Sequence, residues 1–237
     1  MNKRINNTEE LLNSIANNQS LILKDAEYPI SEFTISQYSK NVYYKDAYDG
    51  RELWLNDITK LDLNGFNGAH IHSSPRYAYV MCFENSSDIR IDNVKFGHQP
   101  ESGGCEGGVL RFDNCQNIVL ENLELYGCGR VGLTLSNCRH IFIKDSTITK
   151  CTEGLVELKD CENVVFANCT FSENTSSESF IRHCNNVIFA SCKFLNNRYG
   201  WNKADYIINV LDSSYGISHY DCILEGNDAN QLTNYKK

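Results

Sequence analysis

Two sets of charged and polar side chains recur at a fixed step along this chain and have the chemistry to bind or cleave a polar polymer. Arg111, Thr134 and Glu157 lie 23 residues apart, and Arg130 and Glu153 keep the same step. A guanidinium can hold a carboxylate through two hydrogen bonds. A pair of carboxylates can supply the acid and base of glycoside hydrolysis. Either chemistry requires a fold that brings residues one step apart side by side.

The cysteines follow the same step, which raises the question of a metal site. Zinc sites use pairs of ligands two to four residues apart, and this chain has no CxxC pair. We therefore predict no metal site and no cofactor, and interpret the cysteines as small packing residues, with disulfides between stacked cysteines as an alternative under oxidation. Eleven is an odd number, so complete internal pairing is excluded. The columns are Cys115, Cys138, Cys161 and Cys184; Cys105, Cys128 and Cys151; Cys169 and Cys192.

Apolar residues keep the period as well and alternate within it. Ile118, Ile141, Val164 and Val187 form one column, and within "NIVLENLEL" apolar residues alternate in two short runs, Ile-x-Leu and then Leu-x-Leu, which is typical of strands. About 23 residues hold three short strands and three turns. One such coil cannot bury its inner face alone, but stacked coils can. The sequence predicts an all-β, single-stranded parallel β-helix with neighbouring coils about 4.8 Å apart.

The ends of the chain divide it into three parts. Residues 1–20 are predicted to be a capping segment, with a helix over 8–17 that Asn7 and Glu10 begin as a capping box. Residues 21–227 form the β-helix, and 228–237 form a tail without an apolar stripe. We expect a loop or a partner to cover the far end of the solenoid.

These motifs resemble the right-handed parallel β-helix proteins of the pectin-lyase-like superfamily. The opening "TEELLNSIANNQSLILKDAEYPI" is similar to the leader that caps many of them, and "NCQNIVLENLEL" and "CNNVIFASCKF" resemble their repeats. The resemblance covers most of 7–227 and implies a right-handed coil. It does not select an activity, because relatives include pectate lyases, polygalacturonases and noncatalytic carbohydrate-binding proteins. Polygalacturonase-like motifs are only partly present, as Gly97-His98-Gln99 and Arg90-Ile91-Asp92.

Two breaks in the period predict loops at one corner. Extra residues follow Phe96 and Phe194, which share a column, so the 97–105 and 196–205 loops should flank a groove whose floor carries the Arg111 column. The two loops are four coils apart, or about 19 Å. The residues expected along the loops are His98, Glu101 and Glu106 on one side, and Arg198, Trp201 and Lys203 on the other.

Three readings of the groove stay open. A polysaccharide lyase would use Arg111 or Arg130 against a uronate carboxylate, with His98 as the base. A glycoside hydrolase would use two of Glu106, Glu153 and Glu157. The remaining reading is that the arginines and glutamates form ordinary surface ion pairs on a noncatalytic protein.

A different surface supports an alternative function. Val119, Phe142, Val165 and Ile188 lie between inward residues and should form an outward apolar stripe. Such a stripe could be covered within the chain, or could bind a protein partner or a second copy.

Charge and composition exclude other classes. The net charge is −8 and the basic residues are scattered, which argues against a nucleic-acid groove. No segment has the apolar length of a membrane span. The first residues lack the apolar core of a signal peptide, so we expect a cytoplasmic protein unless a leader has been removed. The expected partner is an oligosaccharide or polysaccharide.

Overall fold

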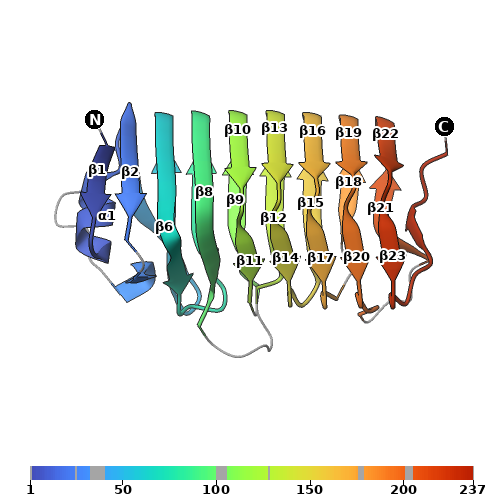
Figure 1. Cartoon of the computed structure of the whole chain (residues 1–237), viewed down its shortest axis with the longest axis horizontal. Helices are drawn as coiled ribbons and strands as arrows, with labels where there is room; N and C mark the ends of the chain where they lie inside the picture. The colour runs from blue at the N-terminus through green and yellow to red at the C-terminus, as the bar shows by residue number, and fades with distance from the viewer. Residues whose placement is uncertain are drawn as a thin grey trace.

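The computed structural model describes residues 2–24, 26–32, 41–99, 106–127, 129–175, 179–200 and 205–236. It confirms the predicted all-β parallel β-helix, in which similar coils stack along one axis from the N-terminus to the C-terminus (Figure 1). Ile118 pairs with Ile141, Ile141 with Val164, and Val164 with Val187, so the 23-residue step in the sequence is the step between coils.

Each regular coil has three strands, which define three faces of the solenoid. Face 1 and face 2 belong to one continuous sheet, and the long strands β6 and β8 contribute to both. The strands of face 1 are β1 (Asn2–Ile5), β2 (Gln19–Leu23), β6 (Thr59–Ser73), β8 (Ser87–His98), β10 (Gln116–Glu121), β13 (Arg139–Lys144), β16 (Glu162–Ala167), β19 (Asn185–Ala190) and β22 (Tyr215–Tyr220). Face 2 adds β3 (Glu27–Pro29), β11 (Glu124–Tyr126), β14 (Thr147–Thr149), β17 (Thr170–Ser172), β20 (Lys193–Leu195) and β23 (Ile223–Glu225).

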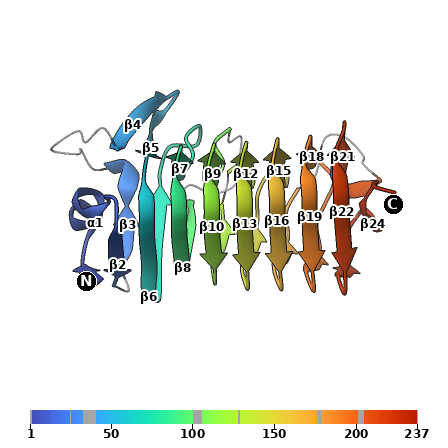
Figure 2. The ribbon, with the colours of Figure 1, turned by 90° about the horizontal axis from the view of Figure 1, so that it is seen from above.

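Face 3 is a separate sheet that begins with an antiparallel hairpin. The hairpin strands β4 and β5 project from the solenoid near its N-terminal end (Figure 2), and the later strands are parallel to one another. The strands of face 3 are β4 (Val42–Ala47), β5 (Gly50–Asn56), β7 (Met81–Glu84), β9 (Leu110–Asp113), β12 (Val131–Ser136), β15 (Gly154–Lys159), β18 (Phe180–Arg182), β21 (Tyr206–Leu211) and β24 (Gln231–Thr233).

The core runs along the axis and is built from the inward residues of all three faces. Equivalent aromatic rings lie directly over one another: Phe166 stacks on Phe189 with centroids 4.9 Å apart, and Phe171 on Phe194 at 4.7 Å. These separations match the spacing of hydrogen-bonded strands. The alternation of buried and outward residues in the sequence therefore specifies which side chains form the core.

Two of the three corners are short, and each uses residues in the left-handed conformation. Asn114, Asn137, Asp160 and His183 occupy one corner with φ between 51° and 54°. Asparagine and aspartate tolerate this conformation better than most residues. The side chains also link the coils, because Asn137 donates to Asn114 at 3.0 Å and Asn114 donates to Asn85 at 2.6 Å.

The main cysteine column lines the inside of this same corner. The Cys138 thiol donates to the Phe112 carbonyl at 3.3 Å, and the Cys161 thiol to the Leu135 carbonyl at 3.4 Å. Ser214 follows the column and accepts from the Cys184 amide at 3.1 Å. The thiols therefore satisfy backbone groups at a buried turn, and the nine cysteines in the described ranges are all free.

The N-terminal cap forms with a shorter helix than the one expected. Helix α1 covers Thr8–Ser14, and the Asn7 side chain accepts from the Glu10 amide at 2.9 Å. The Glu10 carboxylate reaches the Asn6 amide at 2.8 Å instead of that of Asn7, which makes a capping box displaced by one residue. At the other end, β24 pairs with β21, so part of the expected tail extends face 3.

A buried amide column offers a test of how the corners hold the coils together. Asn174 accepts from the Cys151 amide at 3.0 Å and donates to the Ile148 carbonyl at 2.9 Å. We expect Asn174→Ala to lower the free energy of unfolding by about 2–4 kcal/mol, because two buried backbone groups lose their partners. Chemical denaturation measures the change.

The matched control is Asn185→Ala, since that side chain is half-buried and makes no hydrogen bond with the described part of the chain. If Asn174→Ala lowers the free energy of unfolding no more than the control does, the inner amides do not stabilise the corner.

Candidate functional site

The predicted floor column exists on face 3. Arg111 pairs with Thr134, and Thr134 with Glu157, in neighbouring strands β9, β12 and β15. They line a pocket of about 350 Å³ on the outer surface of this face. The lining residues are Tyr79, Glu106, Arg111, Arg130, Thr134, Leu135, Ser136, Glu157, Lys159 and Phe180. Five of the residues selected from the sequence are therefore brought into one pocket.

Contacts to one side of its guanidinium hold Arg111 in place. Its Nε donates to Asp113 at 2.7 Å, and its guanidinium carbon lies 5.6 Å from the ring centroids of both Trp54 and Tyr79. The terminal nitrogens make no hydrogen bond with the described ranges. Desolvation acts to lower the pKa of Arg111, but the charge and hydrogen bond of Asp113 outweigh it and raise the pKa. The group is a positioned cation that can receive an anion from the pocket side.

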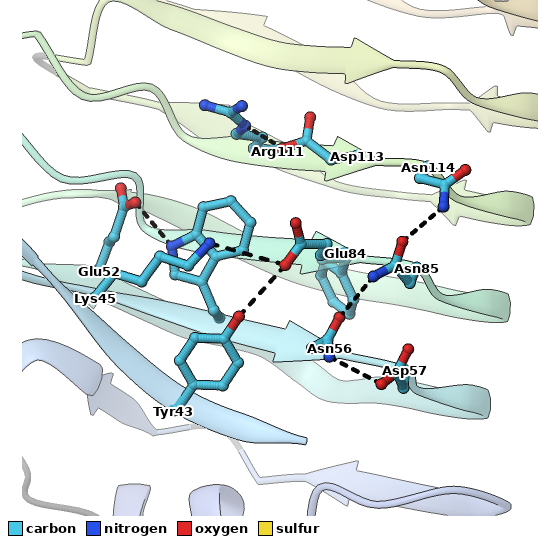
Figure 3. A network of polar contacts seen from close by, with 12 residues as sticks. Tyr43, Lys45, Glu52, Asn56, Asp57, Glu84, Asn85, Arg111, Asp113 and Asn114 are labelled. Carbon is cyan, nitrogen blue, oxygen red and sulfur yellow. Dashed lines mark hydrogen bonds and ion pairs between the residues drawn. The ribbon is translucent and has the colours of Figure 1, made fainter. Parts of the chain in front are cut away.

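The aromatic side of Arg111 is part of a larger polar network (Figure 3). Lys45 lies 3.2 Å from the Trp54 ring centroid and 3.8 Å from Glu84, whose carboxylate also accepts from Tyr43 at 3.4 Å. Cations over aromatic rings are attracted by the ring face. Trp54 thus contacts two cations, and the network lies on the N-terminal side of Arg111.

Tyr79 also contacts Arg111 and is linked to the floor. Its hydroxyl hydrogen-bonds the Thr134 hydroxyl at 3.0 Å, and its amide donates to Glu52 at 3.0 Å. Burial raises the pKa of Tyr79 to about 12, so the phenol stays protonated at neutral pH. Gly108 allows this placement, because a Cβ there would come within 2.4 Å of the Tyr79 ring.

Arg130 contacts Glu153, which was predicted beside it, and also Glu157 from the Arg111 column. Its Nε lies 2.8 Å from Glu153, and one terminal nitrogen lies 3.6 Å from Glu157. All three side chains are partly exposed, so the ion pairs contribute little stability, up to about 1 kcal/mol each. Their arrangement nevertheless places a guanidinium between two carboxylates at the edge of the pocket. Glu106 is exposed and also lines the pocket.

His98 lies elsewhere than expected. Strand β8 continues through His98, so the alternation that buries Phe96 also turns His98 inward, and it is only 2% exposed. Its Nε2 donates to the Ala78 carbonyl at 2.9 Å, and desolvation lowers its pKa below the ordinary value. His98 is not among the pocket residues, and we assign it the role of bracing the loop that carries Tyr79.

The second loop is only partly described. Arg198 lies at the expected corner, where it forms a bridge with Thr175 and an ion pair with Asp228 at 3.1 Å. It does not line the pocket. Glu101, Trp201 and Lys203, and with them Cys105 and Cys128, lie outside the described residues.

The apolar stripe is present but exposes little surface. Val119, Phe142, Val165 and Ile188 are in register across face 1. Phe142 is 36% exposed, and the other three are less exposed because their neighbours on the same sheet cover them. This stripe is therefore a weaker candidate for a binding surface than the pocket on face 3.

The described residues contain neither a metal-ligand cluster nor a membrane-spanning helix. No group of three or more His, Cys, Asp or Glu side chains there could hold a metal ion. No helix among these residues has the length and apolar character needed to cross a membrane.

Sequence reasoning missed Trp54, Tyr79 and Asp113. Trp54 and Tyr79 precede the regular repeats, in coils where insertions hide the period. Asp113 is two residues from Arg111 on one strand, so the alternation could have placed both on the outer surface.

Comparison with known proteins agrees with this geometry. Residues 58–229 match the family described as "Right handed beta helix region", and the chain belongs to this family. A 112-residue stretch, 44% of this chain, is 28% identical to pectate lyase B of Dickeya chrysanthemi. The matched part is 28% of the length of that enzyme, so the chain spans less than a third of this curated relative.

A solved pectate lyase structure has the same fold. A pectate lyase from Paenibacillus sp. 0602 superimposes with a TM-score of 0.55 and 8% identity, over 97% of this chain and 78% of that one. An alginate lyase from Paenibacillus sp. str. FPU-7 has a TM-score of 0.45 and 10% identity, over 94% and 97% of the two chains.

The environment of His98 predicts how stability depends on pH. Because the folded state lowers its pKa below about 6.5, the unfolded chain binds the proton more readily. Stability from neutral His98 is therefore complete above about pH 6.5 and declines as the pH falls below it. His98→Gln, whose amide can still donate to Ala78, should flatten the decline in denaturation midpoint between about pH 7 and pH 5.

His70 and His72 also have lowered pKa values through desolvation, and these two histidines are present in both the wild type and His98→Gln. The difference between the two pH profiles thus reports His98 alone. Parallel profiles would show that its protonation is not linked to unfolding.

Proposed function

We propose that this protein binds a uronate-containing polysaccharide along face 3 and cleaves it by elimination. The observation that carries the proposal is the guanidinium of Arg111, which Asp113 and two aromatic rings position at the edge of the pocket. A carboxylate on a sugar ring is the ligand that this geometry suits best. The similarity to pectate lyase B supports the same substrate class, since pectate is a polyuronate.

The pocket also contains groups suited to elimination. Arg111 would neutralise the substrate carboxylate, which stabilises negative charge on the adjacent carbon. Glu157 or Glu106 would remove the proton from that carbon, and the electron pair would form a double bond to the next carbon as its bond to the glycosidic oxygen breaks. The Tyr79 phenol, which stays protonated, would give its proton to the leaving oxygen.

Hydrolysis is the less favoured alternative. A glycosidase needs one protonated carboxylic acid beside the scissile bond. Glu153 and Glu157 both contact the same Arg130 guanidinium, whereas a glycosidase acid has to present its proton to the glycosidic oxygen. The positioned arginine and phenol fit elimination better than they fit a two-carboxylate mechanism.

The binding part of the proposal has a direct test. We expect Arg111→Ala to weaken binding of a galacturonate oligosaccharide by about tenfold or more, since a charge-assisted hydrogen-bonded pair contributes about 1.5–3 kcal/mol. Isothermal titration calorimetry measures the affinity. Arg90→Ala is the matched control, because Arg90 is an exposed, ion-paired arginine on face 1.

The affinity should also fall with added salt, and a neutral oligosaccharide of equal length should bind more weakly. If wild type and Arg111→Ala bind the galacturonate oligosaccharide with equal affinity, the proposed site is wrong.

The chemical part is tested by the product. Elimination leaves an unsaturated sugar whose ultraviolet absorbance can be followed. We expect Tyr79→Phe to slow its formation by about a hundredfold or more while changing affinity little, as for loss of a general acid. Product formation at the wild-type rate would exclude Tyr79 as the acid, and absence of an unsaturated product from the wild type would leave a binding protein without lyase activity.

A further inference from the structure

An exposed pair of tyrosines lies beside the pocket and has no role in the site described so far. Tyr48, at the turn between β4 and β5, is 89% exposed, and Tyr77 is 41% exposed. Their ring centroids are 5.0 Å apart with the planes tilted by 56°. Single exposed aromatic residues are common, but a contacting pair this exposed is a surface feature that calls for a ligand.

The tip of the hairpin holds this pair in position through backbone contacts. The Asp49 carboxylate accepts from the Arg76 amide at 2.6 Å and from the Tyr77 amide at 3.0 Å. Gly50 packs on Pro75 so closely that a Cβ would come within 2.4 Å of the proline ring. The two segments that carry the tyrosines are therefore fixed to each other.

The following residues are held just as firmly. The Arg76 carbonyl accepts from the amides of Glu106 and Gly107 at 3.1 and 3.0 Å. Glu52 accepts from the Tyr79 amide, and His98 donates to the Ala78 carbonyl, each at the distance given above. Both tyrosines are thus presented by rigid backbone, and binding a ligand there would require little ordering.

The pair is continuous with the proposed groove. Tyr77 is two residues before Tyr79, which lines the pocket, and Glu52 of the hairpin contacts both Tyr79 and Trp54. A polymer that fills the pocket and extends toward the N-terminal coils would reach the tyrosines next.

We infer that Tyr48 and Tyr77 form an outer aromatic subsite for a pyranose ring of a polysaccharide bound in the pocket. This inference rests on the proposed function. The apolar face of a sugar ring is matched in size to one or two tyrosine rings, whereas a protein partner needs an interface of roughly 800 Å² on each side. The Asp49 carboxylate oxygens each accept from a backbone amide, so the subsite relies on stacking for binding.

The test compares galacturonate oligosaccharides of two lengths. A trisaccharide should fill only the pocket, whereas an octasaccharide should reach the tyrosines. We expect Tyr48→Ala and Tyr77→Ala to weaken octasaccharide binding by about threefold to tenfold, the range of an aromatic contact, and to leave trisaccharide binding unchanged. Tyr77→Trp should retain the octasaccharide affinity.

The control is Tyr215→Ala, which removes a 60% exposed tyrosine from the last coil of face 1. Equal octasaccharide affinity in wild type and both alanine variants would overturn the subsite while leaving the pocket intact. The subsite would also be overturned if the alanine variants lost the same factor in affinity for the trisaccharide as for the octasaccharide. A wild-type protein that binds neither length would overturn the proposed function and the subsite together.

Discussion

Each coil of this protein has to present its backbone hydrogen-bonding groups to the next coil in the same register, and the rest of the structure depends on that requirement. Buried backbone groups that lack partners are costly, so every corner must also satisfy the groups that the strands leave over. Columns of asparagine, serine and cysteine do this work: Asn174 bonds two backbone groups, and the Cys161 thiol bonds a carbonyl of the preceding coils. The repeated cysteines are explained by turn geometry.

The same register gives the candidate site its precision. A residue on one strand of face 3 has a fixed neighbour on the next strand, which is how Arg111, Thr134 and Glu157 come to share one pocket. The Trp54 network and Tyr79 both lie against the Arg111 end of this floor.

The regular coils were predictable from the sequence because their period is unbroken. The column that contains Ile118 and the floor column of Arg111 could both be read from spacing alone, and the structure confirms each. The early coils were less accessible, since the hairpin β4–β5 interrupts the period and hides Trp54 and Tyr79.

His98 shows a different limit. The sequence break after Phe96 suggested a loop, whereas the strand continues for two more residues and its alternation turns His98 into the interior. Helix α1 also ends three residues earlier than its apolar pattern suggested, because its C-cap residue Ile15 adopts an extended conformation with ψ of 114°. Both differences concern where an element ends, which periodicity specifies least.

The unequal corners have a consequence for how such a protein can diversify. In the regular coils two corners keep a nearly constant length and use left-handed residues such as Asn137 and Asp145, although β6 has three extra residues between Asn64 and Ala69. The third corner already carries the length variation after Phe96 and Phe194. The longer insertions among the regular coils lie along the edge that borders face 3, where a loop can change in length while the strands keep their register, which separates change in recognition from change in architecture.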